Sequence, residues 1–286
     1  MEKCASPMTA LRLLLTIVTL WMSAPSHAQL QDTAVKQCAS RHPPGVARAH
    51  CLAPWLEDIV VRQGTARALE AAQGLVQSGV MNDCHFMSHT VGHATWRKTR
   101  ELHTAFGACT TACIQGCMHG VVEASMMEAS AGRVAPKQAL AFCDSLGEDT
   151  LERRQCLHGL GHGIMHQRRD NVNAAVKECE ALGARFERDQ CLGGLWMQWA
   201  HFPLSEGAEG FRRKAPALCA AVREDLMGPC AHAVGGAAMF ATGHDEVLSK
   251  AICKRLPAPQ QAECNKGVQY ESELLRKGDG HGHHHH

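Results

Sequence analysis

Seven cysteines recur along this chain at intervals of 33 to 39 residues, and this spacing limits the folds that the chain can adopt. We call them the marker cysteines: Cys51, Cys84, Cys117, Cys156, Cys191, Cys230 and Cys264. A repeat of this length without strand-like alternation is typical of stacked helical hairpins. The sequence therefore predicts an all-α solenoid of about seven helical hairpins.

A second set of cysteines precedes five of the markers by 11 to 13 residues, with turn-like segments such as Leu256–Pro259 in between. This spacing lets a cysteine near the end of one helix meet one near the start of the next. The expected intra-hairpin disulfides are Cys38–Cys51, Cys143–Cys156, Cys179–Cys191, Cys219–Cys230 and Cys253–Cys264. Each short loop closed in this way stabilises its hairpin by roughly 2–4 kcal/mol.

Four cysteines break the pattern, namely Cys84, Cys109, Cys113 and Cys117. They are expected to form two more bridges, one of which crosses between repeats, or to include a metal-binding thiolate pair. An exported protein favours bridges, because its compartment is oxidising.

A small residue recurs three positions after the marker cysteine in the later repeats. The residues concerned are Gly120, Gly159, Gly194, Ala233 and Gly267. Glycine weakens a helix by about 1 kcal/mol relative to alanine, so its recurrence needs a compensating reason. We expect that a neighbouring helix backbone approaches closely at these positions.

The two ends of the chain have their own composition. Basic residues precede an apolar stretch, Leu13–Met22, that is too short to span a bilayer, and a small-x-small cleavage site ends at Ala28. This predicts a signal peptide over residues 1–28 and a periplasmic or secreted protein cleaved near Ala28. We expect the helical repeat domain over residues 29–276, followed by a disordered His-rich tail at 277–286. No later stretch is apolar for long enough to be a membrane helix.

Charge and cysteine content restrict the partners. Outside the expected signal peptide, 27 basic residues balance 27 acidic ones, which argues against nucleic acid because phosphate binding needs clustered positive charge. Fourteen cysteines remain there, an even number and a high density that favour disulfides over free thiols.

Histidines, with one glutamate, are spaced four residues apart in the repeats that begin at Cys84, Cys117 and Cys156. On a helix this spacing places side chains on one face, a turn apart. Neutral imidazole is the commonest metal ligand in proteins, and a carboxylate can complete such a site. The predicted metal ligands are His89, His93, His119, Glu123, His158 and His162. Copper and zinc are the metals that fit best, and iron is a further option.

Three strings carry these residues: Cys84-His-x-x-x-His-x-x-Gly-His93, Gly116-Cys-x-His-Gly-x-x-Glu123 and Cys156-x-His-Gly-x-Gly-His-Gly163. They resemble motifs of exported bacterial Cys/His helical-repeat proteins whose activity is uncharacterised. The resemblance covers roughly residues 80–166 and implies no activity. In length alone, the repeat also resembles tetratricopeptide-class hairpins.

Other histidines have simpler interpretations. His85, His103 and His201 are expected to be polar or capping residues, and His232 is expected to serve structure.

Three functions fit the sequence. The first is copper or zinc handling by an exported metal-binding protein. The second is a metal-dependent enzyme that uses the same site with Glu123 as its acid or base. The third is a disulfide-bonded scaffold whose concave face binds a protein or peptide.

Overall fold

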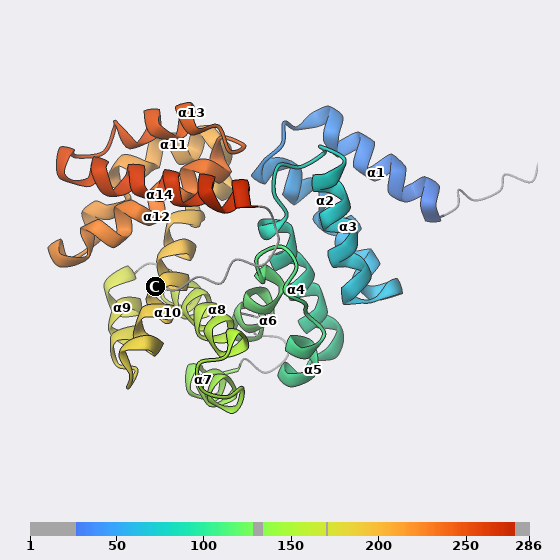
Figure 1. The fold of residues 1–286 in the computed structure, drawn as a ribbon, viewed down its shortest axis with the longest axis horizontal. Coiled ribbons are helices and arrows are strands. Elements are labelled where there is room, and N and C mark those ends of the chain that lie inside the picture. Colours follow the sequence, from blue (N-terminus) through green and yellow to red (C-terminus); the bar gives the residue numbers. More distant parts are fainter. Residues whose placement is uncertain (1–26, 128–133, 170, 278–286) are drawn as a thin grey trace, which may run out of the picture.

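The computed structural model describes residues 27–127, 134–169 and 171–277, with side chains described from Thr33 to Arg276. Every regular element in these ranges is a helix (Figure 1), which confirms the all-α prediction. The expected signal peptide and His-rich tail lie outside the described residues, except for His27, Ala28 and Lys277. None of the helices described is both long and apolar enough to cross a membrane.

The helices alternate along the chain between two sets. One set, the marker helices, carry a marker cysteine or directly follow one, and each is preceded by a helix of the other set. The marker helices are α2 (Val46–Gln63), α4 (His85–Thr99), α6 (Gly116–Met127), α8 (Leu151–Gln167), α10 (Arg185–His201), α12 (Met227–Ala241) and α14 (Ala258–Lys277). The preceding helices are α1 (His27–Arg41), α3 (Thr65–Gln77), α5 (Leu102–Gly107), α7 (Pro136–Ser145), α9 (Val172–Glu180), α11 (Gly207–Leu218) and α13 (Glu246–Cys253). Short 3-10 turns stand at η2 (Phe202–Glu206), η3 (Cys219–Ala221) and η4 (Glu224–Leu226).

The marker helices form one row in chain order. Each packs against the next, from α2 to α14, and each also packs against the helix that precedes it. The row curves, as Figure 1 shows. This arrangement brings the motif-bearing helices α4, α6 and α8 together as neighbours.

Glycines set the spacing within the row. A Cβ atom at Gly194 of α10 would lie 1.9 Å from the carbonyl oxygen of His158 on α8. Conversely, a Cβ at Gly161 of α8 would lie 1.9 Å from the carbonyl oxygen of Cys191 on α10. Gly120, Gly159 and Gly267 meet the backbone of the adjacent marker helix in the same way. The expected close approach of helix backbones is confirmed.

The disulfides follow the spacing of the cysteines. All five intra-hairpin pairs expected from the sequence are present. The four irregular cysteines form Cys84–Cys113 and Cys109–Cys117. The first of these bridges joins the start of α4 to the loop before α6, so it crosses between repeats. No thiolate pair remains among the described cysteines.

The two ends of the row meet. Asn82, before α4, donates a hydrogen bond from Nδ2 to the carbonyl oxygen of Gly243, after α12, at 2.6 Å. The His244 Nε2 atom lies 4.0 Å from an oxygen of Asp83. These contacts join the loop before α4 to the loop after α12 across the curved row. A solenoid of regular repeats stays a prediction.

Candidate metal centre

Three neighbouring helices each present a column of ligand-type side chains at intervals of four residues. The columns are His85, His89 and His93 on α4, His119 and Glu123 on α6, and His158, His162 and His166 on α8. Helices this close bring the columns into contact. Ring centroids lie 5.4 Å apart for His89 and His119, and 4.6 Å apart for His119 and His158. The histidine rings therefore form one continuous cluster.

His119, His158 and His162 form one group that can hold a metal ion. Each offers a ring nitrogen, and these nitrogens lie within 4.8 Å of one another. His119 Nδ1, His158 Nε2 and His162 Nε2 are buried and have no hydrogen-bond partner among the described residues. A buried polar atom without a partner costs free energy, which a coordinated cation would recover.

Glutamines on neighbouring helices fix the orientation of two of these rings. The Nε2 atom of His119 contacts Oε1 of Gln155, and Nδ1 of His162 lies 2.9 Å from Oε1 of Gln198. Because an amide oxygen only accepts, the contacting nitrogen carries the hydrogen. The opposite nitrogen of each neutral ring then has its lone pair available for a metal, an arrangement common around metal-bound histidines.

A second group consists of His85, His89 and again His119, with ligand atoms within 4.8 Å of one another. The Nδ1 atom of His85 donates to the carbonyl oxygen of Cys113 at 3.1 Å. The Nε2 atoms of His85 and His89 face each other at 3.3 Å. Two ligands bound at ~2.0–2.1 Å to a tetrahedral ion lie about 3.3 Å apart, so this separation suits a shared cation.

Glu123 is surrounded by imidazoles. Its Oε2 atom lies 3.1 Å from both His89 Nδ1 and His93 Nε2, and its Oε1 atom lies 2.9 Å from His166 Nε2. Burial raises the pKa of this carboxyl, but the electrostatic interaction with His93 and the hydrogen bonds from all three histidines together hold that pKa well below its ordinary value. Glu123 is therefore a buried anion that orients His89.

Burial favours the neutral form of His89, His119, His158 and His162. It lowers the pKa of His89 to about 3, although the hydrogen bond to Glu123 opposes the shift. Burial also holds the pKa values of His119 and His158 well below the ordinary histidine value, and it lowers that of His162. Neutral imidazole is the form that binds metal.

The structure distributes the residues predicted as ligands between two roles. His89, His119, His158 and His162 belong to the groups that can hold an ion. His93 and Glu123 lie beside them and are bonded to each other, outside both groups.

Sequence reasoning missed three histidines. His85, expected to be a polar or capping residue, lies in the second group. Its position four residues before His89 was the available signal. His166 bonds to Glu123, and its position four residues after His162 carried the same signal.

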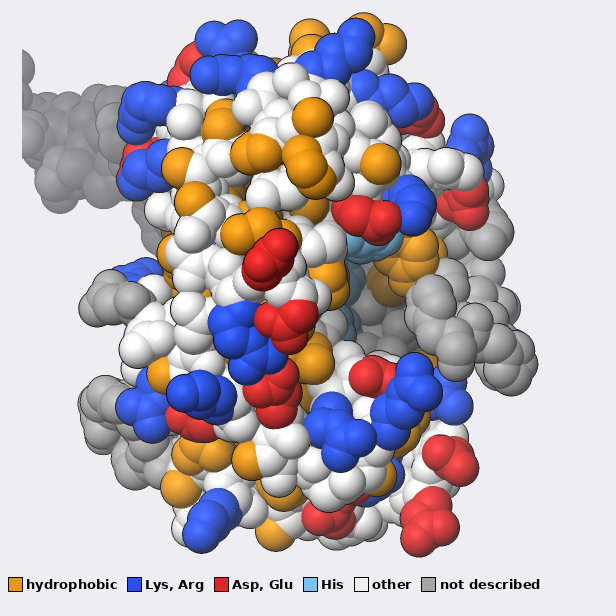
Figure 2. All heavy atoms as spheres, turned by 90° about the vertical axis from the view of Figure 1, so that its left-hand side faces the viewer, with side chains coloured by type: hydrophobic (Ala, Val, Ile, Leu, Met, Phe, Trp, Pro, Cys, Tyr) orange, Lys and Arg blue, Asp and Glu red, His pale blue; other side chains and the backbone are white. Residues whose placement is uncertain are grey.

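The third is His201, expected to be a polar or capping residue, which is partly buried near the cluster. Burial lowers its pKa to about 3, and His162 contributes to the same shift. Its ring lies 6.3 Å from that of Phe86 and 5.3 Å from that of Phe240. On the face shown in Figure 2, histidine side chains lie inside a hollow with hydrophobic side chains on its walls.

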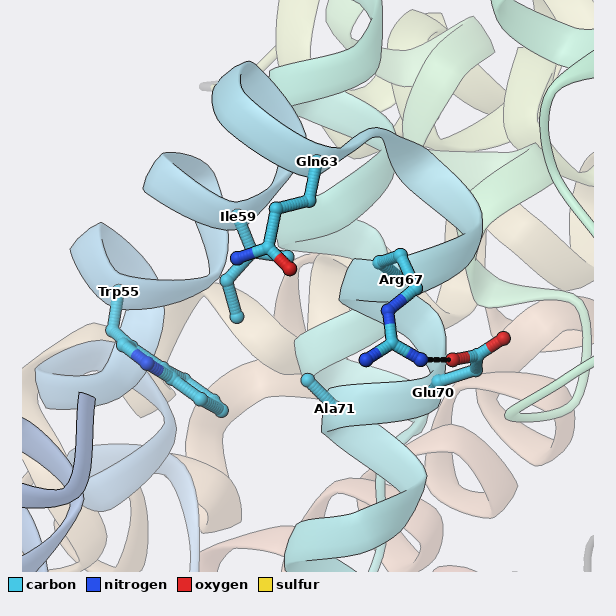
Figure 3. Close-up of a pocket in the computed structure, with 6 residues that line it drawn as sticks. All are labelled: Trp55, Ile59, Gln63, Arg67, Glu70 and Ala71. Atoms are coloured by element: carbon cyan, nitrogen blue, oxygen red, sulfur yellow. Dashed lines mark hydrogen bonds and ion pairs between the residues drawn. The ribbon is translucent and has the colours of Figure 1, made fainter. Parts of the chain in front are cut away.

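A separate pocket of about 210 Å³ lies between α2 and α3 (Figure 3). Its lining residues are Trp55, Ile59, Gln63, Arg67, Glu70 and Ala71. Arg67 and Glu70 pair with each other there, and both are well exposed. The pocket shares no residue with the histidine cluster and offers no comparable set of ligands.

Comparison with protein-family models, curated proteins and solved structures finds no match. The site must therefore be interpreted from its own chemistry. Its described residues supply several neutral imidazoles, one buried carboxylate and fixed hydrogen-bond partners.

Proposed function

We propose that this protein is an exported metal-binding protein that handles copper or zinc at the histidine cluster. One observation carries the proposal: His119, His158 and His162 offer ring nitrogens within 4.8 Å of one another, and each ring has a buried nitrogen without a hydrogen-bond partner among the described residues. A structural role for these histidines would leave such atoms bonded, because buried polar groups are nearly always paired.

The donor set favours the metal classes expected from the sequence. Imidazole suits zinc, copper and iron, whereas magnesium and calcium prefer oxygen ligands. The described cysteines are all in disulfides, which leaves nitrogen as the donor. The charge of Glu123, 3.1 Å from His89 Nδ1, partly compensates that of a bound cation.

Disulfides support export. Seven bridges among the described residues are typical of a protein that matures in an oxidising compartment. The sequence features of residues 1–28 agree with this location.

Metal analysis of the full chain tests the proposal, once the tail histidines His281 and His283–His286 have been changed to serine. We expect about one zinc or copper ion per chain after dialysis against a weak chelator. His119→Ala should abolish tight binding, because His119 belongs to both groups of ligands. His103→Ala, on the exposed surface of α5, is the matched control and should keep the metal. Little metal in the parent protein, or equal metal in both variants, would contradict the proposal.

A metal-dependent enzyme is the second candidate. The observation in its favour is that a group of three histidines leaves one position of a tetrahedral ion for water or substrate. Cobalt-substituted protein distinguishes the two functions. Azide should change the cobalt spectrum if that position is open, and should leave it unchanged if protein atoms fill it.

A further inference from the structure

We infer that the cluster provides two mutually exclusive positions for a single metal ion, which share His119 and allow the ion to pass between them. This inference rests on the proposed metal binding. We call the positions the first station, formed by His85, His89 and His119, and the second station, formed by His119, His158 and His162.

The ring of His119 neighbours the rings of all four other ligands. Its ring centroid lies 5.5 Å from that of His85 and 5.4 Å from that of His89. It lies 4.6 Å from that of His158 and 6.0 Å from that of His162, and the rings of His89 and His162 are themselves 5.1 Å apart. The ring therefore reaches both stations from one place on α6.

His119 has one nitrogen to offer. Its Nε2 atom contacts the amide oxygen of Gln155, which requires a hydrogen on that nitrogen. The lone pair of the neutral ring is then on Nδ1, the buried atom without a partner. One lone pair coordinates one ion, so a complete set of three histidines exists at only one station at a time.

The first station is built as firmly as the second. The Cys113 carbonyl accepts from His85 Nδ1, and Glu123 accepts from His89 Nδ1 at 3.1 Å. Both acceptors direct the Nε2 lone pairs toward the 3.3 Å gap between the two rings. Cys113 is itself held by its disulfide to Cys84 and starts a left-handed backbone segment, with φ of 55°. Such a segment persists only where the surrounding structure enforces it.

The stations are alike in burial, since each combines two buried histidines with one that is partly exposed. At the first station the partly exposed residue is His89, whose side chain is 15% exposed. At the second station it is His158, while His162 is fully buried. An ion that keeps its bond to His119 exchanges two ligands, instead of three, to pass from one station to the other.

Cobalt(II) is the probe for the test, added to the full chain whose tail histidines are serine. The first station is removed in the double variant His85→Gln, His89→Gln, and the second in His158→Gln, His162→Gln. We expect one Co²⁺ per chain in the parent and in each double variant. Each variant should have its own visible spectrum, and the parent should show their weighted mixture.

Affinity supplies a second, quantitative measurement. For exclusive stations, the association constant of the parent equals the sum of those of the two double variants. His119→Gln should lower the association constant at least 100-fold, whereas His103→Gln should match the parent.

Two Co²⁺ per chain in the parent, or no binding in one double variant that keeps the parent's circular dichroism, would overturn the inference. If a double variant does not fold, the single variant His89→Gln serves for the first station and His162→Gln for the second. A parent that binds no cobalt, zinc or copper would instead refute the proposed function itself.

Discussion

Gly194→Ala tests whether glycine contacts hold the motif-bearing helices together. The added Cβ would lie 1.9 Å from the carbonyl oxygen of His158, whereas real Cβ atoms essentially never approach closer than 3.0 Å. The backbones of α8 and α10 would have to separate by about 1.1 Å to relieve the overlap. The obstacle is backbone, so no side-chain rotation can remove it.

The energetic cost follows from this geometry. Overpacking of a tightly packed interior costs about 1–3 kcal/mol, and alanine recovers less than 1 kcal/mol through its better helix propensity. The difference between these two effects should lower the free energy of unfolding by up to about 2.5 kcal/mol. In a domain of this size each kcal/mol corresponds to a fall in Tm of about 2–4 °C.

Urea unfolding followed by circular dichroism measures the change, with Gly74→Ala as the matched control. Gly74 lies inside α3, and its added Cβ would meet nothing within 4 Å. The control should be more stable than the parent by about 0.5–1 kcal/mol. If Gly194→Ala were as stable as Gly74→Ala, the close approach of α8 and α10 would not be a real constraint.

Three further predictions concern the metal, a disulfide and pH. Gln155→Leu removes the acceptor that orients His119. We expect the zinc affinity, measured by calorimetry, to fall about 10–100-fold. The control Gln77→Leu, on α3, should leave the zinc affinity unchanged. The double variant Cys143→Ser, Cys156→Ser removes a disulfide between residues 13 positions apart. Urea unfolding should show that the free energy of unfolding falls by about 2–4 kcal/mol. A fall below about 1 kcal/mol would refute the stabilising role of this disulfide. Burial and a nearby aspartate raise the pKa of Glu271 to about 8 from an ordinary 4.5, so the folded state holds a proton that the unfolded chain releases. Stability from this group falls as pH rises from about 4.5 to 8, and Glu271→Gln should exceed the parent in Tm at pH 8.5 but match it at pH 4.

The cysteine spacing made most of the fold predictable. Covalent pairing across a short turn admits few geometries, so separations of 11 to 13 residues were enough to assign five bridges. The meeting of the two row ends was not predictable, since it depends on how small rotations between neighbouring helices accumulate. Its contacts, such as Asn82 with Gly243, join residues 161 positions apart that no local pattern relates.

The sequence predicted which helices carry the site, but it predicted only part of the contacts between the site's atoms. The interval of four residues places His89, His119 and His162 on facing columns, and the structure confirms that they meet. Intervals cannot tell which nitrogen faces a neighbour and which carries a hydrogen. Glu123 illustrates the limit, because three imidazoles from two other helices occupy its oxygens.

Fold and site are linked through single residues of α8. His158 supplies a ring to the second station, and its carbonyl oxygen lies against Gly194 of the next helix. A change at Gly194 therefore displaces the backbone that positions a proposed ligand, although Gly194 itself has no ligand atom. We expect Gly194→Ala to weaken cobalt binding at the second station while the first station, on α4 and α6, keeps its spectrum. Loss of both spectra in a variant that stays folded would mean that the stations do not move independently.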